Sequence, residues 1–431
     1  MLQPIQFAVQ STKDESLPGK ETARLLNMYP EIVGDGLTLR SAPGLIETAD
    51  VGPGQVEAMI STPEGIYIAV GGAFKLWNNP VLTTLGNIPQ GDTTMARNRT
   101  QIAVVSGRKY HVWDGASIGP VDLPFSNVGS VSFLSNYFLM SEELGQAFAY
   151  TLDADTIDGL NFASAEYQPD NLRRIMVAND LIWMMGSETV EPWQVTGAAT
   201  LPFPRISGAV KEKGLRSTLE AVVLDNTLFW ISHEGRMYRM GDTGQIVSTD
   251  AMCAALEGRT GRMMAFQQRR HDFAVARLTG RAALVFDPST GQWWERGTGV
   301  CHDEWDVTAT VHHEGVWYGG TRTGKLVTFG GYQDLGETLR REVISSNITQ
   351  GGNRFSVDEV NLRVSGSGTV MISYSKDGGR TFSDERNRTF GSDFEYPIQI
   401  NRLGQCRQFC LKVAMTDNAE FSIHEAGIEI S

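Results

Sequence analysis

A sequence pattern of two short apolar runs on either side of a glycine-bearing turn occurs seven times along this chain. Its clearest copy is Asp272 to Asp287, where Phe273 and Val275 alternate with small residues before a Thr-Gly turn and a second apolar run. This pattern predicts a β-hairpin. The copies end at Asn78, Asp114, Asp153, Gly197, Gly241, Asp287 and Gly330. These ends lie 36 to 46 residues apart, a period typical of β-propeller blades.

Most copies follow a further strand-like run and a tight turn, as at Asp225-Asn226, which makes that run antiparallel to the hairpin. A more polar stretch comes after each copy. One such stretch, 291–296, is expected to form a fourth strand at the exposed outer edge of its blade. Four strands per unit predict an all-β chain with a six- or seven-bladed propeller over residues 45–335, since the first or last copy could instead belong to a stem.

Aromatic side chains stand just before the end of most copies. Because they are spaced around a ring, they are expected to fill the space between blades and not to form a ligand cage. They are Trp77, Trp113, Trp193, Tyr238, Phe286 and Phe329.

The two ends of the chain do not follow the repeat. Residues 1–44 are interrupted by Pro30 and Pro43 and predict an extended segment, which is expected to dock on the C-terminal domain or on a neighbouring subunit. Residues 336–431 hold five alternating runs and predict a small C-terminal β-sandwich.

The charge of the chain limits its partners. A net charge of −13 argues against a surface that grips nucleic-acid phosphates. The first residues lack the features of an export signal, and no window holds the eighteen or so apolar residues of a membrane helix. We therefore expect synthesis in the cytoplasm and no membrane association.

Residues Ser375 to Phe382 match the Asp-box pattern, Ser-x-Asp-x-Gly-x-Thr followed by an aromatic residue. In this hairpin turn the carboxylate of Asp377 binds its own backbone amides. Sialidases carry several copies on their blades, whereas this copy is single and lies outside the repeats. We expect it to stabilise a turn.

The remaining motifs predict structure and not chemistry. Residues 319–325, GGTRTGK, resemble a phosphate loop, but Leu326 replaces the magnesium-binding hydroxyl residue and the flanks predict strands. The carboxylates of Asp153, Asp155 and Asp158 fit no complete calcium loop and are expected to cap the chain locally.

Two further groups of possible metal ligands are also interpreted as structural. His312 and His313, near residues 302–304, would point to opposite faces of one strand. Cys406 and Cys410 would lie about 13 Å apart on a strand, so we expect buried thiols. The sequence therefore predicts no enzyme, with no catalytic, cofactor-binding or metal-binding residues and no cofactor.

Three segments resemble a known family. Residues 27–45 (NMYPEIVGDGLTLRSAPGL), 370–385 (VMISYSKDGGRTFSDE) and 401–413 (NRLGQCRQFCLKV) look like parts of the tail nozzle or hub proteins of short-tailed bacteriophages, also called packaged-DNA stabilisation proteins. The resemblance covers nearly the full length. Phe382 and Ile400 stand where the family often has Trp.

This resemblance implies a structural virion protein of the phage tail. Six copies would form a homo-hexamer ring below the portal and adaptor proteins, close the DNA channel, retain packaged DNA and carry tail fibres, a spike or a needle. Passing DNA would be contacted weakly and without sequence reading, because an acidic lumen cannot hold it by ion pairs.

Two other classes stay open from the sequence. A glycan-binding or sialidase-like propeller is favoured only by the Asp-box and the aromatic residues. A cellular scaffold of the WD or kelch kind is suggested by Trp113-Asp114 and Trp305-Asp306, without the Gly-His partner of the WD repeat.

Overall fold

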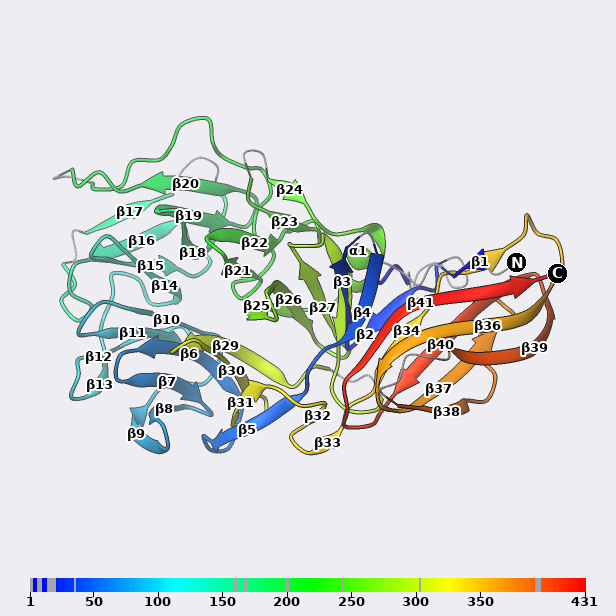
Figure 1. Cartoon of the computed structure of the whole chain (residues 1–431). Helices are drawn as coiled ribbons and strands as arrows, with labels where there is room; N and C mark the ends of the chain where they lie inside the picture. The colour runs from blue at the N-terminus through cyan, green and yellow to red at the C-terminus, as the bar shows by residue number, and fades with distance from the viewer. Residues whose placement is uncertain are drawn as a thin grey trace.

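The structure is a computed structural model, and it describes residues 3–5, 10–13, 21–34, 36–158, 161–165, 169–198, 201–241, 244–301, 304–391 and 397–431. These residues are almost entirely in strands, which form a propeller with a smaller sandwich beside it (Figure 1). The predicted all-β propeller and sandwich are confirmed. No helix in the described part of the chain is long and apolar enough to cross a membrane.

The propeller has seven blades within the described residues. The innermost strands of successive blades lie against one another, and the last one contacts the first, so the ring is closed. The first blade consists of β6 (Val56–Thr62), β7 (Gly65–Val70), β8 (Ala73–Asn78) and β9 (Val81–Asn87). The second consists of β10 (Thr93–Arg97), β11 (Ile102–Ser106), β12 (Lys109–Trp113) and β13 (Ile118–Pro120).

The third to sixth blades follow in chain order. The third consists of β14 (Val128–Leu134), β15 (Tyr137–Glu142), β16 (Ala147–Thr151) and β17 (Phe162–Ser164). The fourth consists of β18 (Leu172–Ala178), β19 (Leu181–Gly186) and β20 (Val190–Gln194). The fifth consists of β21 (Ala221–Leu224), β22 (Thr227–Ile231), β23 (Met237–Arg239) and β24 (Gln245–Ile246). The sixth consists of β25 (Gly261–Gln268), β26 (His271–Leu278), β27 (Ala283–Asp287) and β28 (Gln292–Arg296).

The seventh blade is closed by a strand from the start of the chain. Its own strands are β29 (Val307–His313), β30 (Val316–Thr321) and β31 (Lys325–Phe329). The outer strand is β5 (Leu45–Asp50), antiparallel to β31. A short hairpin of β32 (Gln333–Asp334) and β33 (Glu337–Thr338) continues this sheet, with β32 parallel to β5.

Hydroxyl groups on the innermost strands link each blade to the next. Thr308 Oγ1 donates to the carbonyl oxygen of Val56 at 2.7 Å, which joins the seventh blade to the first. Ser132 Oγ donates to the carbonyl of Ile175 at 2.7 Å and joins the third blade to the fourth. These bonds give a hydrogen-bond partner to backbone carbonyls that face a neighbouring blade. Such carbonyls are not paired with another strand of their own sheet.

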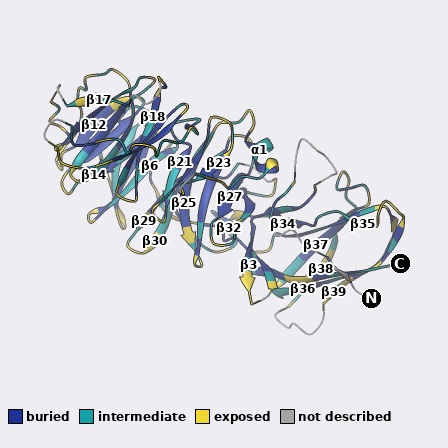
Figure 2. Cartoon of the chain, turned by 90° about the horizontal axis from the view of Figure 1, so that it is seen from above, coloured by how far each residue is buried: buried dark blue, intermediate teal, exposed yellow. Residues whose placement is uncertain are grey.

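The predicted inter-blade role of the aromatic residues is confirmed. Figure 2 shows that burial follows the strands through the middle of each blade. All six residues are buried or packed against a hydrophobic cluster, with Phe329 the most exposed. Between the fifth and sixth blades, the short helix α1 (Asp250–Leu256) adds Met252 and Leu256 to the same kind of core.

Two predictions about outer strands are wrong. Within the described residues, the fourth blade has no regular fourth strand. Pro202 and Pro204 interrupt the segment that follows β20, and this segment forms isolated bridges at Arg205 and Lys211. In the sixth blade, β28 is the predicted fourth strand, but it is buried and not an exposed edge. The N-terminal strand β2 (Arg24–Leu26) lies beside it in parallel.

The sandwich consists of two sheets that both receive N-terminal strands. One sheet contains β3 (Met28–Val33), β4 (Gly36–Ser41), β41 (Phe421–Ile430), β36 (Phe355–Gly366) and β39 (Ile398–Cys406), with β1 (Gln3–Pro4) also paired to β41. The other contains β2, β34 (Arg341–Ile344), β40 (Gln408–Met415), β37 (Gly368–Ser375) and β38 (Arg386–Phe390), with β35 (Ile348–Thr349) also paired to β40.

Strand β2 joins the two domains into one sheet. It is parallel to β28 of the sixth blade and antiparallel to β34 of the sandwich, so the ladder runs from β25 to β38 without a break. The largest hydrophobic cluster is likewise continuous, because Leu25, Met28 and Tyr29 lie between the propeller side and the sandwich side. The prediction that the N-terminal segment docks on the sandwich is confirmed. The boundaries at residues 44 and 335 stay a prediction.

Candidate functional site

Organised polar groups gather in two places, the junction between propeller and sandwich and the central channel of the propeller. At the junction the first buried cation is Arg296, which is 1% exposed. Its Nη1 donates to Asn27 Oδ1 at 3.3 Å, and its Nη2 donates to the carbonyl of Pro43. Nη2 also lies 3.9 Å from Asp334 Oδ1, and the guanidinium stacks 5.6 Å from the ring centre of Trp305. Arg296 therefore links the sixth blade to two positions of the N-terminal segment.

Burial changes the proton affinity of this pair. It lowers the pKa of Arg296 and raises the pKa of Asp334, since each charged form loses its hydration. The opposite charge of the partner acts against both shifts.

The second buried cation, Arg341 on β34, connects the sandwich to the N-terminal strands. Its Nη1 donates to the Ala419 carbonyl at 2.6 Å and to Ser41 Oγ at 3.2 Å, and its Nη2 donates to the Asp417 carbonyl. The guanidinium lies 5.1 Å from the ring centre of Tyr332. Burial lowers the pKa of Arg341 to about 10. One side chain thus ties three segments that are distant in the sequence.

A buried carboxylate, Glu295 on β28, completes the junction. Its Oε2 lies 2.7 Å from Arg24 Nη2 and 3.3 Å from Arg281 Nη2. Burial alone would raise the pKa of Glu295, but the positive charge and hydrogen bonds of Arg24, with the charge of Arg281, hold it below its usual value. The pairing keeps this carboxylate ionised inside the protein.

A strained turn reaches across the rim of the junction. Arg269 and Arg270 have φ values of 48° and 71° at the β25–β26 hairpin, a conformation that favours Asn, Asp or Gly. Other inner hairpins, such as Asn179-Asp180, carry the expected residues. Arg269 Nη1 donates to Glu420 Oε1 at 2.8 Å and its Nη2 donates to Tyr332 Oη at 3.0 Å. These contacts with the sandwich and with the segment before β32 offset the strain.

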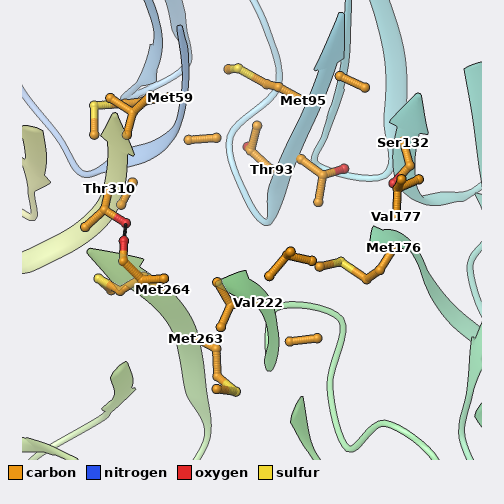
Figure 3. Close-up of a pocket in the computed structure, with 18 of the residues that line it drawn as sticks. Met59, Thr93, Met95, Ser132, Met176, Val177, Val222, Met263, Met264 and Thr310 are labelled. Carbon is orange, nitrogen blue, oxygen red and sulfur yellow. Dashed lines mark hydrogen bonds between the residues drawn. The ribbon is translucent and has the colours of Figure 1, made fainter. Parts of the chain in front are cut away.

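The central channel encloses a cavity of about 570 Å³ between the innermost strands. Figure 3 shows side chains from opposite blades converging on it, among them Met59, Met95, Met176 and Met264. A volume of this size suits a small ligand and not a DNA duplex, whose major groove alone is about 12 Å wide. This cavity is therefore too small to hold a duplex.

The Asp-box forms the predicted turn between β37 and β38. Asp377 Oδ1 accepts from the amides of Arg380 and Thr381 at 3.1 and 2.9 Å, and Asp377 Oδ2 accepts from Thr381 Oγ1 at 2.6 Å. Ser375 Oγ donates to Asp377 Oδ1 at 2.6 Å and accepts from the Gly379 amide at 2.9 Å. These bonds hold the pKa of Asp377 well below its usual range. The interpretation as a turn-stabilising motif is confirmed.

Cys406 and Cys410 are buried thiols as predicted, but they lie on different strands. Both thiols are free, and between them the chain crosses from β39 in one sheet to β40 in the other. The prediction that they lie on one strand is wrong. Burial raises the pKa of Cys410 to about 11.

The other candidate motifs are held in ordinary structure. Residues 319–325 form part of the β30–β31 hairpin. His313 Nδ1 lies 2.9 Å from Ser61 Oγ, and His312 packs against Trp317. Residues 302 and 303 lie outside the described residues. Within the described ranges, no three His, Cys, Asp or Glu residues are grouped to hold a metal ion.

The three aspartates form no common site. In their loop, the Asp153 carbonyl accepts from the Thr156 amide, and the Asp158 carbonyl accepts from the Asn161 amide. The Asp155 carboxylate accepts from Thr156 Oγ1 at 3.3 Å. The bonds of Asp153 and Asp158 use backbone carbonyls, so the capping role of their carboxylates stays a prediction.

Sequence reasoning missed the buried arginines of the junction and the two arginines of the channel described below. The available signal was weak, since charged residues at strand positions usually face solvent. Only the pairing of distant strands shows that Arg296 and Arg341 are enclosed.

Comparisons with known proteins match both domains. Residues 21–329 match the family described as Bacteriophage P22 Gp10, beta-propeller, and residues 340–431 match Bacteriophage P22 Gp10, beta-sandwich. The tail hub protein gp10 of Salmonella phage P22 is 25% identical over 307 residues, which are 63% of this chain and 64% of that protein. The chain thus matches under two thirds of this relative's length.

Comparison with solved structures gives, among others, a computationally designed protein, Ika8, and YCF48 from Cyanidioschyzon merolae. The Ika8 comparison has a TM-score of 0.42 and 16% identity, covering 75% of this chain and 100% of that one. The YCF48 comparison has a TM-score of 0.45 and 10% identity, covering 67% and 99%.

Proposed function

The chain belongs to the Bacteriophage P22 Gp10 family, and on that premise we propose that it is a structural tail hub protein of a phage virion. Six copies form a homo-hexamer ring below the portal and adaptor. The ring closes the DNA channel, retains the packaged DNA and carries fibres, a spike or a needle. The protein is made in the host cytoplasm, resides in the virion tail and is not an enzyme.

The observation that carries this proposal is the fusion of the two family domains into one sheet. A ring that withstands packaged DNA needs subunits whose domains do not swing independently. Strand β2 pairs with both domains, and Arg296 and Arg341 each bind the N-terminal segment from one side. This arrangement suits a rigid wall element better than a hinged one.

The distribution of charge between the two domains supports the proposed weak contact with DNA. Residues 45–335 hold 22 basic and 32 acidic residues, a net charge of −10, whereas residues 340–431 hold 11 and 12. In the proposed ring the lumen lies between copies, because the propeller channel is too small for a duplex. A lumen lined by propellers would repel DNA phosphates and let the duplex slide.

The alternative of a glycan-binding or sialidase-like propeller gains no support. The Asp-box lies in the sandwich, and its polar groups are engaged with one another. A fluorogenic sialoside assay with the intact protein tests this alternative, and turnover would contradict the proposed structural role.

Quantitative peptide mass spectrometry of purified virions tests the hub role directly. The chain should be present at about six copies per particle, counted against the portal protein. Native mass spectrometry of the isolated protein mixed with portal and adaptor then tests ring formation. Absence from the particle would overturn the proposal, and a copy number that fits no ring would overturn its hexameric form.

A further inference from the structure

Two arginine side chains lie at one end of the propeller channel. Arg174 is near the start of β18 in the fourth blade, and Arg262 is near the start of β25 in the sixth blade. Both line the 570 Å³ cavity. The innermost strands run the same way along the channel, so this end is shared with Glu57 of β6 and with Asp92, which precedes β10.

The two guanidinium groups differ in their hydrogen bonds. Arg174 Nη1 donates to the carbonyls of Thr218 and Ala221 at 3.1 and 3.0 Å. Arg262 Nη1 is shielded from solvent and has no hydrogen-bond partner in the part of the chain that the structure describes. A buried cationic donor without a partner is costly, so its surroundings favour an acceptor.

Charges of both signs surround Arg262. Burial lowers the pKa of Arg262 and of Arg174, and the positive charge of Arg262 lowers the pKa of Arg174 further. Glu57 and Asp92 act in the opposite direction on Arg262. Arg277 on β26 acts on Arg262 as a further positive charge, which lowers the pKa of Arg262. The Nη2 of Arg277 also forms an ion pair with Glu304.

The shape of the cavity is compatible with a bound molecule. Its volume falls within the range of small-ligand sites, which typically combine apolar walls with a few convergent polar groups. Methionine and valine side chains supply the wall in the middle of the channel (Figure 3). Arg97 lines the cavity from the other end of the inner strands.

We propose that Arg174 and Arg262 form a binding site for a small oxyanion at this end of the channel. An oxyanion there accepts hydrogen bonds from the free Nη1 of Arg262 and reduces the repulsion between the two guanidinium groups. Arginine suits this role because its planar, permanently charged fork matches carboxylate and phosphate oxygens. The site does not depend on ring formation or on the hub role.

Isothermal titration calorimetry with inorganic phosphate tests the site on the full-length protein at constant ionic strength. We expect binding to the unaltered protein and a loss of affinity of about tenfold or more in Arg262→Gln, because a charged hydrogen bond is removed. Arg363→Gln is the matched control, since this arginine is exposed on the sandwich and paired with Glu425. It should bind phosphate as the unaltered protein does.

A gain-of-binding variant separates a ligand site from a structural role. Glu57→Gln removes a carboxylate that competes for Arg262, so phosphate affinity should rise roughly fivefold. Equal phosphate affinity in the unaltered protein, Arg262→Gln and Glu57→Gln would overturn the proposal. So would a lack of phosphate binding to the unaltered, folded protein.

Discussion

The junction and the channel both contain arginines, but these arginines differ in their burial and in their hydrogen bonds. Arg296 and Arg341 at the junction each donate to at least two acceptors from distant segments. Within the described residues, Arg341 lacks a partner only for its shielded Nε and uses both Nη atoms, whereas Arg262 lacks a partner for its shielded Nη1. An arginine can therefore fasten two domains where several acceptors surround its Nη atoms, or keep an Nη donor available for a ligand where they do not.

Removing the N-terminal segment is the strongest way to break the junction. Deleting residues 1–40 takes away β2 and buried side chains that include Leu25, Met28 and Tyr29. The sandwich should lose more than about 5 kcal/mol, by the usual value of a few buried side chains, and should no longer unfold with the propeller. The propeller should keep its own transition because β5 still closes the ring. Differential scanning calorimetry reports both transitions.

Exposed residues of the same segment give the control for that deletion. Ile32→Ser and Val33→Ser change side chains that are 63% and 58% exposed, so neither should move a transition. If the deleted chain instead unfolds like the full chain, the segment does not hold the domains together. A loss of ring assembly with both transitions intact would place its role between subunits.

The same substitution at the two sites compares them directly. Arg341→Met should destabilise the protein by about 3 kcal/mol, because several buried acceptors lose their donor. Arg262→Met should be close to neutral or stabilising in phosphate-free buffer, because it removes an unpaired buried donor. Urea unfolding midpoints measure both. Equal losses would show that Arg262 is as firmly integrated as Arg341.

Acid should weaken the junction through Glu295. Its pKa in the folded protein lies below the unfolded value of about 4.3, so its contribution is present above that pH and is lost as the pH falls through the folded value. Glu295→Gln should cost about 2 kcal/mol at pH 7, and its difference from the unaltered protein should shrink below about pH 4. A difference that stays constant from pH 7 to pH 3 would contradict this assignment.

The smallest expected effect concerns the strained hairpin on the rim. The double substitution Arg269→Asn and Arg270→Gly relieves the positive φ angles but removes the contacts with Glu420 and Tyr332. Because the ion pair is partly exposed, the two effects should cancel within about 0.5 kcal/mol. Arg269→Asn alone, measured by thermal unfolding beside the double variant, shows how much each arginine contributes. A large loss in the double variant would mean that the rim contact is stronger than its exposure suggests.

Local patterns predicted much of the propeller. The hairpin period and the Asn-Asp turns act within one blade, where neighbours in sequence are neighbours in space. The aromatic residues near the ends of most copies pack between consecutive blades, so their regular spacing predicted them as well. The Asp-box was predictable for the same reason, because its bonds span only a few residues. The prediction of an exposed edge at β28 was wrong because a distant segment, β2, covers this strand. The prediction that Cys406 and Cys410 share a strand was wrong because the chain crosses there from one sheet of the sandwich to the other.

The sequence by itself determined a β-propeller followed by a sandwich, together with the family to which the chain is similar, because these follow from periodicity and short motifs. Only the tertiary structure decided that there are seven blades, that β5 closes the last one, and that β2 joins both domains into one sheet. It also decided which arginines are buried with partners and which are not. Such pairings join residues hundreds of positions apart, and no local preference of the chain specifies them.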